Sequence, residues 1–157
     1  IERIRQHPLK RALRLSKMTL AALEATLLAY RQPETLVAQV PTLRLLTRPL
    51  AEIEALGARL LPVLTAALGP GWSVATVPTE NQVGSGALPD KAIPGAALAL
   101  AAGNGSGGAL PRLAERLRAL PVPVIGRIAD NRLLLDLRGL EDEAGFAAQL
   151  PAGSLAS

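Results

Sequence analysis

Two arginines near the start of the chain, Arg11 and Arg14, have a spacing that would let both bind one anion. They lie three residues apart, so on a helix both guanidinium groups would leave the same face. Two planar guanidinium groups on one face can bind the oxygens of a phosphate-like dianion. For an isolated pair of this kind, however, the spacing by itself favours a solvated basic face over a binding site.

The positive charge of the chain is concentrated around this pair. Lys10, Lys17 and the single histidine, His7, lie in the same stretch. Residues 1–14 carry five basic side chains and one acidic side chain, whereas residues 15–157 carry twelve of each. The net charge of +4 at pH 7 therefore belongs to the first 14 residues. This distribution argues against a broad nucleic-acid-binding surface.

The sequence lacks the residues that several other kinds of functional site require. The sequence has no cysteine, which excludes a disulfide framework, thiolate chemistry and a Cys-based metal site. It has only one histidine, which excludes a His-rich metal site. The glycines of residues 103–108 lack the lysine of a phosphate-binding loop, which favours a flexible turn. The carboxylates between residues 130 and 143 lie at predicted turn, strand and helix-start positions, which explain their presence without a catalytic role. The sequence by itself therefore shows no complete active site.

A third candidate, Arg127, lies in the apolar stretch V-P-V-I-G-R-I. Its side chain either lies on the outer face of a sheet or points into a site as the partner of a carboxylate or phosphate, and the pattern favours the outer face. The preceding Gly126 indicates a bulge or a close approach of the backbone.

The first part of the chain is predicted to be helical, from its apolar spacing and from prolines at helix starts and stops. A short helix from Pro8 would carry both arginines. The further predicted helices are 19–30, 41–47 and a long helix over 49–68, which Gly69-Pro70-Gly71 ends.

After Gly71 the pattern changes to that of strands and short helices. The predicted strands are 72–77, 96–100, 122–128 and 132–137, with helices over 111–119 and from 141, a hairpin turn at 129–131 and a loop or edge segment at 81–89. Such an order predicts an α+β domain, a mostly antiparallel sheet with helices on one face. We expect a helical arm and linker over 1–47, this domain over 48–150, and a frayed tail over 151–157.

The sequence shows no apolar run of the roughly 20 residues that a membrane span needs, and its first residues lack the apolar core of a signal peptide. We therefore expect a cytoplasmic protein. The chain begins with Ile1, within an amphipathic pattern, and is expected to be part of something longer.

Several segments, taken in order, resemble one known family. These segments are H-P-L-K-R-A-L-R-x-x-K-M-T-L-A-A-L-E-A-T-L, P-T-L-R-L-L-T-R-P, Q-V-G-S-G-A-L-P, P-V-I-G-R-I-x-x-N-R-L-L-L-D-L-R and E-D-E. Together they resemble the C-terminal part of the bacterial L-seryl-tRNA(Sec) selenium transferases, or selenocysteine synthases. The resemblance extends from His7 to Leu150.

The resemblance implies the small C-terminal domain of a fold type I pyridoxal-phosphate enzyme, with the arm leading from a large cofactor domain. It implies a homo-oligomer that converts seryl-tRNA(Sec) to selenocysteyl-tRNA(Sec) with selenophosphate as the selenium donor. Arg11 and Arg14 match family arginines suited to binding phosphate or selenophosphate, and the segment Gln82–Pro89 matches a family loop.

The same resemblance places the Schiff-base lysine upstream of residue 1, because Lys10, Lys17 and Lys91 do not lie in its sequence context. We therefore expect no catalytic residue in this chain and no activity from it alone. Two alternatives remain open: the small domain of another fold type I lyase or aldolase, and a non-enzymatic module whose basic arm binds RNA.

Overall fold

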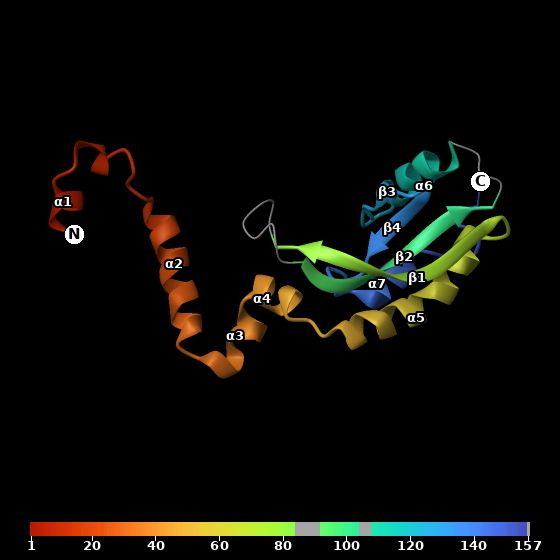
Figure 1. The fold of residues 1–157 in the computed structure, drawn as a ribbon, viewed down its shortest axis with the longest axis horizontal. Coiled ribbons are helices and arrows are strands. Elements are labelled where there is room, and N and C mark those ends of the chain that lie inside the picture. The colour runs from red at the N-terminus through yellow and green to blue at the C-terminus, as the bar shows by residue number, and fades with distance from the viewer. Residues whose placement is uncertain (84–91, 104–107, 157) are drawn as a thin grey trace. The chain divides into compact units, whose positions relative to one another are not determined.

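The computed structural model describes residues 1–83, 92–103 and 108–156. The chain divides into two compact units, Ile1–Thr47 and Arg48–Ser157, which we describe separately as the helical arm and the α+β unit (Figure 1). The predicted loop at 84–89 and the glycines at 105 and 107 lie outside the described residues.

The helical arm consists of short helices that bury no residue completely. Its elements are α1 (Glu2–Arg5), the 3₁₀ turn η1 (Pro8–Lys10), α2 (Lys17–Tyr30), α3 (Pro33–Gln39) and α4 (Pro41–Leu46). Local sequence explains their starts: the Ser16 hydroxyl caps α2, and Pro33 and Pro41 occupy the first turns of α3 and α4. The predicted helices 19–30 and 41–47 are thus confirmed.

The prediction of a short helix carrying both arginines is only partly right. The 3₁₀ turn η1 begins at Pro8, as expected, but ends at Lys10. Arg11 lies in the turn that follows, and Arg14 lies just after that turn. Three 3₁₀ residues are too few to form a helix face.

The long predicted helix is confirmed as α5 (Leu50–Leu68), the first element of the α+β unit. Its buried stripe, Ile53, Leu56, Leu60, Leu64 and Leu68, follows helical spacing. It ends at Gly69, which adopts a φ of 71° that favours glycine. At Gly57 an added Cβ would lie 3.0 Å from Cδ1 of Leu137 and 3.1 Å from Cγ2 of Thr76, so α5 packs closely on the sheet.

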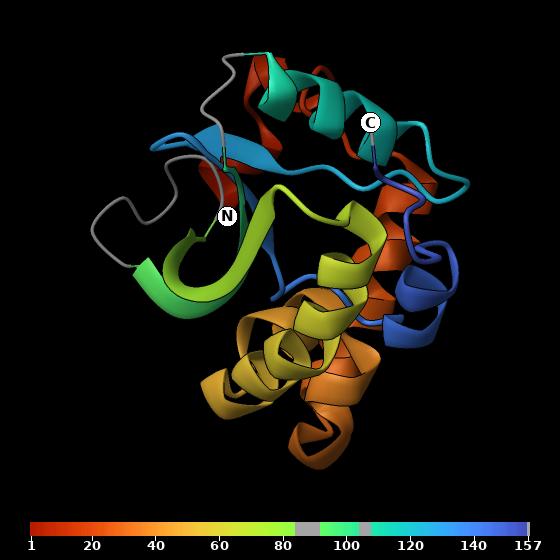
Figure 2. The same cartoon turned by 90° about the vertical axis from the view of Figure 1, so that its right-hand side faces the viewer.

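The sheet is antiparallel and consists of β1 (Trp72–Gln82), β2 (Ala92–Ala102), β3 (Arg127–Ala129) and β4 (Arg132–Asp136). The strand order is β1-β2-β4-β3. The first two form a long, strongly curved hairpin (Figure 2).

One face of the sheet packs against α5, α6 (Ala109–Arg118) and α7 (Glu143–Ala148) in the main core. The opposite face has a small cluster of Ala97, Ala99 and Leu134. The predicted α+β class is confirmed, with helices covering one face of the sheet.

The predicted strand 122–128 is wrong over most of its length, because β3 begins at Arg127. Pro121 and Pro123 lack the N–H groups that a ladder requires. The backbone of Val122 instead exchanges two hydrogen bonds of 3.1 Å with the side-chain amide of Gln149. The expected close approach at Gly126 is confirmed, since an added Cβ would lie 2.8 Å from the carbonyl oxygen of Leu134.

The hairpin between β3 and β4 has the predicted turn. Asp130 and Asn131 adopt φ values of 50° and 55°, both in the left-handed region. Two such residues between paired strands make the type I′ geometry, which matches the twist of the strands.

The prediction of a frayed C-terminal tail is wrong. Leu155 is 2% exposed and belongs to the main core. The backbone N–H groups of Gly153 and Leu155 donate to the carbonyls of Ala66 and Ala67, each at 2.9 Å. These bonds occupy carbonyls in the last turn of α5, which the helix itself leaves without partners.

Candidate anion-binding site

The backbone around Arg11 and Arg14 is held by a series of short-range hydrogen bonds. The N–H of Leu9 donates to Nδ1 of His7 at 3.2 Å, and the N–H of Lys10 donates to the carbonyl of His7 at 3.0 Å. The N–H of Leu13 then donates to the carbonyl of Leu9, also at 3.0 Å. Pro8 fixes one backbone angle at the start of this sequence of turns.

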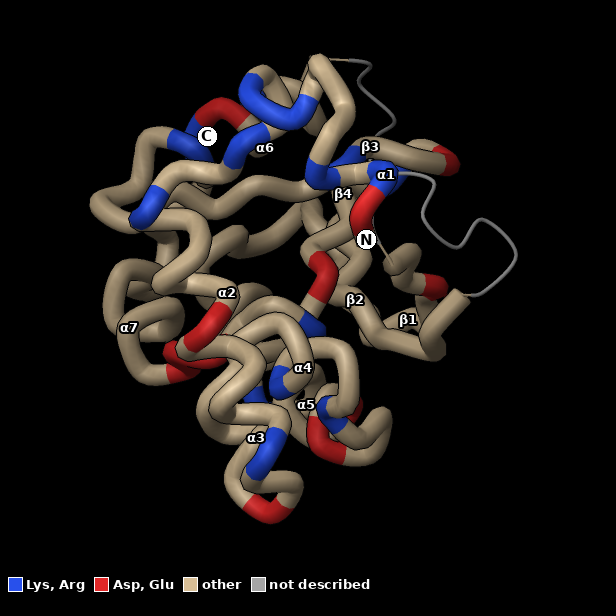
Figure 3. Tube along the Cα trace, turned by 90° about the vertical axis from the view of Figure 1, so that its left-hand side faces the viewer, with Lys and Arg blue, Asp and Glu red and all other residues tan. Residues whose placement is uncertain are grey.

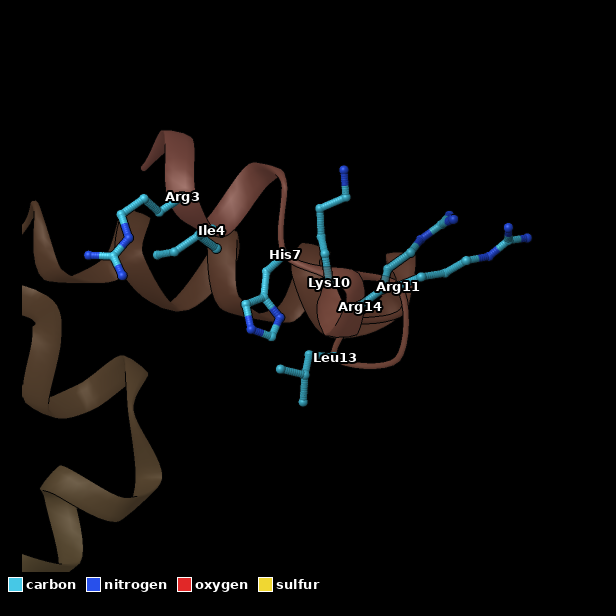
Figure 4. Close-up of a pocket in the computed structure, with 7 residues that line it drawn as sticks. All are labelled: Arg3, Ile4, His7, Lys10, Arg11, Leu13 and Arg14. Atoms are coloured by element: carbon cyan, nitrogen blue, oxygen red, sulfur yellow. The ribbon is translucent and has the colours of Figure 1, made fainter.

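This turn brings Arg11 and Arg14 together. Figure 4 shows both side chains extended in the same direction, with Lys10 pointing to another side. They line one open pocket with Arg3, Ile4, His7, Lys10 and Leu13. Within the described part of the chain, neither Arg11 nor Arg14 has a hydrogen bond or ion pair from its guanidinium group. Both guanidinium groups are therefore free to bind a ligand.

No carboxylate of the neighbouring sequence neutralises this pair. Glu2 bonds the side-chain amide of Gln6 at 3.0 Å and lies 3.8 Å from a guanidinium nitrogen of Arg5. The next acidic residue along the chain is Glu24. Positive charge without a nearby counter-charge favours an anionic ligand.

Arg127 lies in the other unit, so the structure does not place it with Arg11 and Arg14. It stands opposite Leu134 on the edge strand β3 and is exposed. Leu134 belongs to the cluster on the face of the sheet away from the main core. The position of Arg127 is thus the outer-face alternative that the sequence pattern favoured, and its binding of a substrate stays a prediction.

A second group of basic residues lies on α6, which carries Arg112, Arg116 and Arg118 (Figure 3). The guanidinium of Arg116 donates to the carbonyl of Leu155 at 3.0 Å, so this side chain helps to hold the C-terminal segment. Unlike Arg11 and Arg14, this group has a carboxylate, Glu115, within its own helix.

Sequence reasoning missed a polar network at the ends of β1 and β4. Asp136 accepts hydrogen bonds from Asn81 at 2.7 Å and from Thr79 at 3.2 Å. Arg138, which is 6% exposed, donates to Asn81 at 3.1 Å and to the carbonyl of Pro94. Gly95 permits this arrangement, because an added Cβ would collide with Oδ1 of Asn81. The members of this network come from three strand regions, so no local sequence pattern indicates their contact.

An exposed ion pair joins α5 to α7. Arg59 donates to both carboxylate oxygens of Glu143, at 2.7 and 2.8 Å. These hydrogen bonds lower the pKa of Glu143 and raise that of Arg59, and the attraction between the two charges acts in the same direction.

Comparison with known proteins shows the family of the chain. The family model described as L-seryl-tRNA selenium transferase matches residues 1–141. The chain belongs to this family. Curated proteins named L-seryl-tRNA(Sec) selenium transferase from Escherichia fergusonii and Klebsiella pneumoniae are each 55% identical to it over 150 residues. A protein of the same name from Methylocella silvestris is 55% identical over 152 residues.

The alignments cover 96–97% of this chain but 32% of each relative. The chain therefore spans about a third of the length of the selenium transferases it matches. The family predicted from the motifs between His7 and Leu150 is confirmed. Binding of phosphate or selenophosphate by Arg11 and Arg14 stays a prediction.

The described residues of this chain do not make a complete pyridoxal-phosphate site. That cofactor needs a lysine for the Schiff base and a partner for its ring nitrogen, arranged around the ring. Lys10 points away from Arg11 and Arg14 (Figure 4), and both Lys10 and Lys17 are exposed. The two arginines suit a phosphate group alone.

The described residues contain no group of three or more His, Asp or Glu side chains that could hold a metal ion. None of their helices combines the length and the apolar character needed to cross a membrane.

Proposed function

We propose that the whole protein converts seryl-tRNA(Sec) to selenocysteyl-tRNA(Sec), and that Arg11 and Arg14 bind the phosphate group of the selenium donor, selenophosphate. The pair of guanidinium groups extended in one direction, without a carboxylate partner among the described residues, carries this proposal. Membership of the selenium transferase family supplies the substrate class.

The chemistry of the two side chains fits a phosphate-bearing donor. Each guanidinium presents several N–H donors in a plane and can bond two phosphate oxygens at once. When water attacks phosphorus and the phosphorus–selenium bond breaks, selenium leaves with the bonding electron pair and the negative charge of the phosphate stays on its oxygens. Arg11 and Arg14 can hold these oxygens in the donor and in the inorganic phosphate that is released. Lys10 lines the same pocket, but its ammonium group points to another side than the two guanidinium groups.

In this proposal, the rest of the active site lies in residues outside this chain. Pyridoxal phosphate and its lysine belong to that part, and the α+β unit forms a wall of the completed site. The protein is proposed to work as a homo-oligomer with sites at its subunit interfaces. In consequence, residues 1–157 alone would transfer no selenium.

The test compares substrates and variants in the full-length enzyme. We expect selenocysteyl-tRNA(Sec) from seryl-tRNA(Sec) and selenophosphate, and no corresponding product from free serine or cysteine. Arg11→Ala and Arg14→Ala should reduce turnover while leaving the absorbance of the bound cofactor unchanged. Reaction with the free amino acids in place of seryl-tRNA(Sec) would instead indicate a lyase or aldolase of the same fold type.

A matched control is Arg31→Ala, which removes an exposed arginine from the same helical arm. Arg31 lies after α2 and does not line the pocket of Arg11 and Arg14. Its removal should leave turnover within about twofold of the parent value, since surface substitutions away from a site have small effects. Equal losses from Arg31→Ala and Arg11→Ala would refute a specific role for the pair.

A further inference from the structure

His7 holds the start of the turn that carries the two arginines. Its Nδ1 accepts a hydrogen bond from the backbone N–H of Leu9, 3.2 Å away. Pro8 lies between them and has no N–H, so the N–H of Leu9 is the first donor of η1 that needs a partner. The imidazole is therefore the N-cap of this turn.

The hydrogen bond also fixes the tautomer of His7. An imidazole nitrogen that accepts a hydrogen bond carries no proton, so the proton of the neutral ring is on Nε2. Asparagine can reproduce this acceptor, because its side-chain oxygen also bonds N–H groups at a helix start. Glutamine is one methylene longer and is a poor N-cap.

The cap is connected to the arginines through the backbone. Leu9, whose N–H is capped, accepts a hydrogen bond at its carbonyl from the N–H of Leu13. Arg11 and Arg14 lie inside and directly after the segment that this bond closes. The orientation of the Leu9 backbone therefore influences the direction in which both guanidinium groups leave the chain.

We infer that His7 is a positioning residue: its Nδ1 cap holds residues 8–13 in the turn that directs Arg11 and Arg14 toward one phosphate-bearing ligand. Figure 4 shows the imidazole pointing to a different side from the two guanidinium groups, so it acts through them. The identity of the ligand as selenophosphate rests on the proposed function.

Three variants of the full-length enzyme test the cap. We expect His7→Ala and His7→Gln each to raise the KM for selenophosphate about fivefold, the usual effect of losing one N-cap. The kcat should stay within about twofold, because the reacting groups are untouched. His7→Asn should restore the parent KM. The inhibition constant of inorganic phosphate should follow the same order among the variants.

Asp142→Ala provides a matched loss of a different N-cap. The carboxylate of Asp142 accepts from the N–H of Gly145 at 2.8 Å and caps α7, in the other unit. Its removal should leave the KM for selenophosphate unchanged. A KM for His7→Asn as high as that for His7→Ala would overturn the inference, as would an unchanged KM for His7→Ala.

Amide hydrogen exchange separates this inference from the proposed function. The N–H of Leu9 should exchange faster in His7→Ala and His7→Gln than in the parent and His7→Asn enzymes. If Arg11→Ala leaves selenophosphate and phosphate binding unchanged, the proposed ligand is wrong even where the exchange pattern is found. Equal exchange at Leu9 in all four enzymes refutes the cap itself.

Discussion

The guanidinium of Arg138 donates a hydrogen bond to the backbone carbonyl of Arg48, 3.1 Å away and 90 residues distant in sequence. Arg48 in turn donates from Nη1 to the carbonyls of Leu137, Arg138 and Leu140, at distances between 2.7 and 3.3 Å. The two arginines therefore hold the segment just before α5 against the segment that follows β4. Both act within the α+β unit and need no ligand to explain them.

Arg138→Ala should destabilise the α+β unit by about 2–4 kcal/mol, because it removes a buried guanidinium that donates to Asn81 and to the carbonyls of Arg48 and Pro94. Urea denaturation followed by circular dichroism measures this loss. Arg118→Ala, which removes an exposed arginine, should change the free energy of unfolding by about 0.5 kcal/mol or less. Similar midpoints for the two variants would contradict a structural role for Arg138.

Gly126→Ala should destabilise the same unit by about 1–3 kcal/mol, because its methyl group would overlap the carbonyl of Leu134 and the side chain of Leu135. The paired control is Gly139→Ala, where an added Cβ meets nothing within 4 Å. This control should match or slightly exceed the parent in stability. Thermal unfolding of both variants checks the difference, and a stable Gly126→Ala protein would show that β4 is not this close.

Glu143→Gln should lower stability at neutral pH and have progressively less effect in acid. Hydrogen bonds from Arg59 lower the pKa of Glu143 in the folded state, so the pair stabilises the fold above the ordinary glutamate pKa. This contribution is lost as the pH falls through the lowered pKa. The difference in urea midpoint between parent and variant should therefore shrink toward pH 3 and also in high salt, because both groups are exposed. A difference independent of pH would contradict the ionic contribution.

The isolated chain of residues 1–157 should form no selenocysteyl-tRNA when mixed with seryl-tRNA(Sec), selenophosphate and pyridoxal phosphate. Radiolabelled selenium incorporation measures this directly, with the full-length enzyme as positive control. Transfer by the isolated chain would show that its lysines suffice. Salt-dependent RNA binding that disappears on deletion of residues 1–14 would favour the RNA-binding alternative.

Local patterns in the sequence were enough for much of the fold. The buried stripe of α5 repeats at helical spacing, and Asp130 and Asn131 supply the two left-handed residues of the β3–β4 turn. The same reasoning failed at 122–126, where an apolar run suggests a strand but Pro121 and Pro123 prevent regular pairing. Side-chain bonds from Gln149, distant in sequence, decide the path of that segment.

Long-range contacts account for the other failures. Nothing near Leu155 indicates that it fills the core at the end of α5, and the partners of Arg138 come from three other parts of the unit. At the candidate site the spacing of Arg11 and Arg14 could be recognised, because the turn is local. The role of His7 could not be recognised from the sequence, since capping depends on the backbone angles around Pro8.

The selenophosphate dependence of turnover in the full-length enzyme tests the central claim most directly. Loss of a hydrogen-bonded charge pair predicts a KM raised about tenfold to a hundredfold in Arg11→Ala and in Arg14→Ala. The Arg31→Ala control should keep the parent KM. An unchanged KM for selenophosphate in both Arg11→Ala and Arg14→Ala would contradict the assignment of this pair as the site that binds the selenium donor.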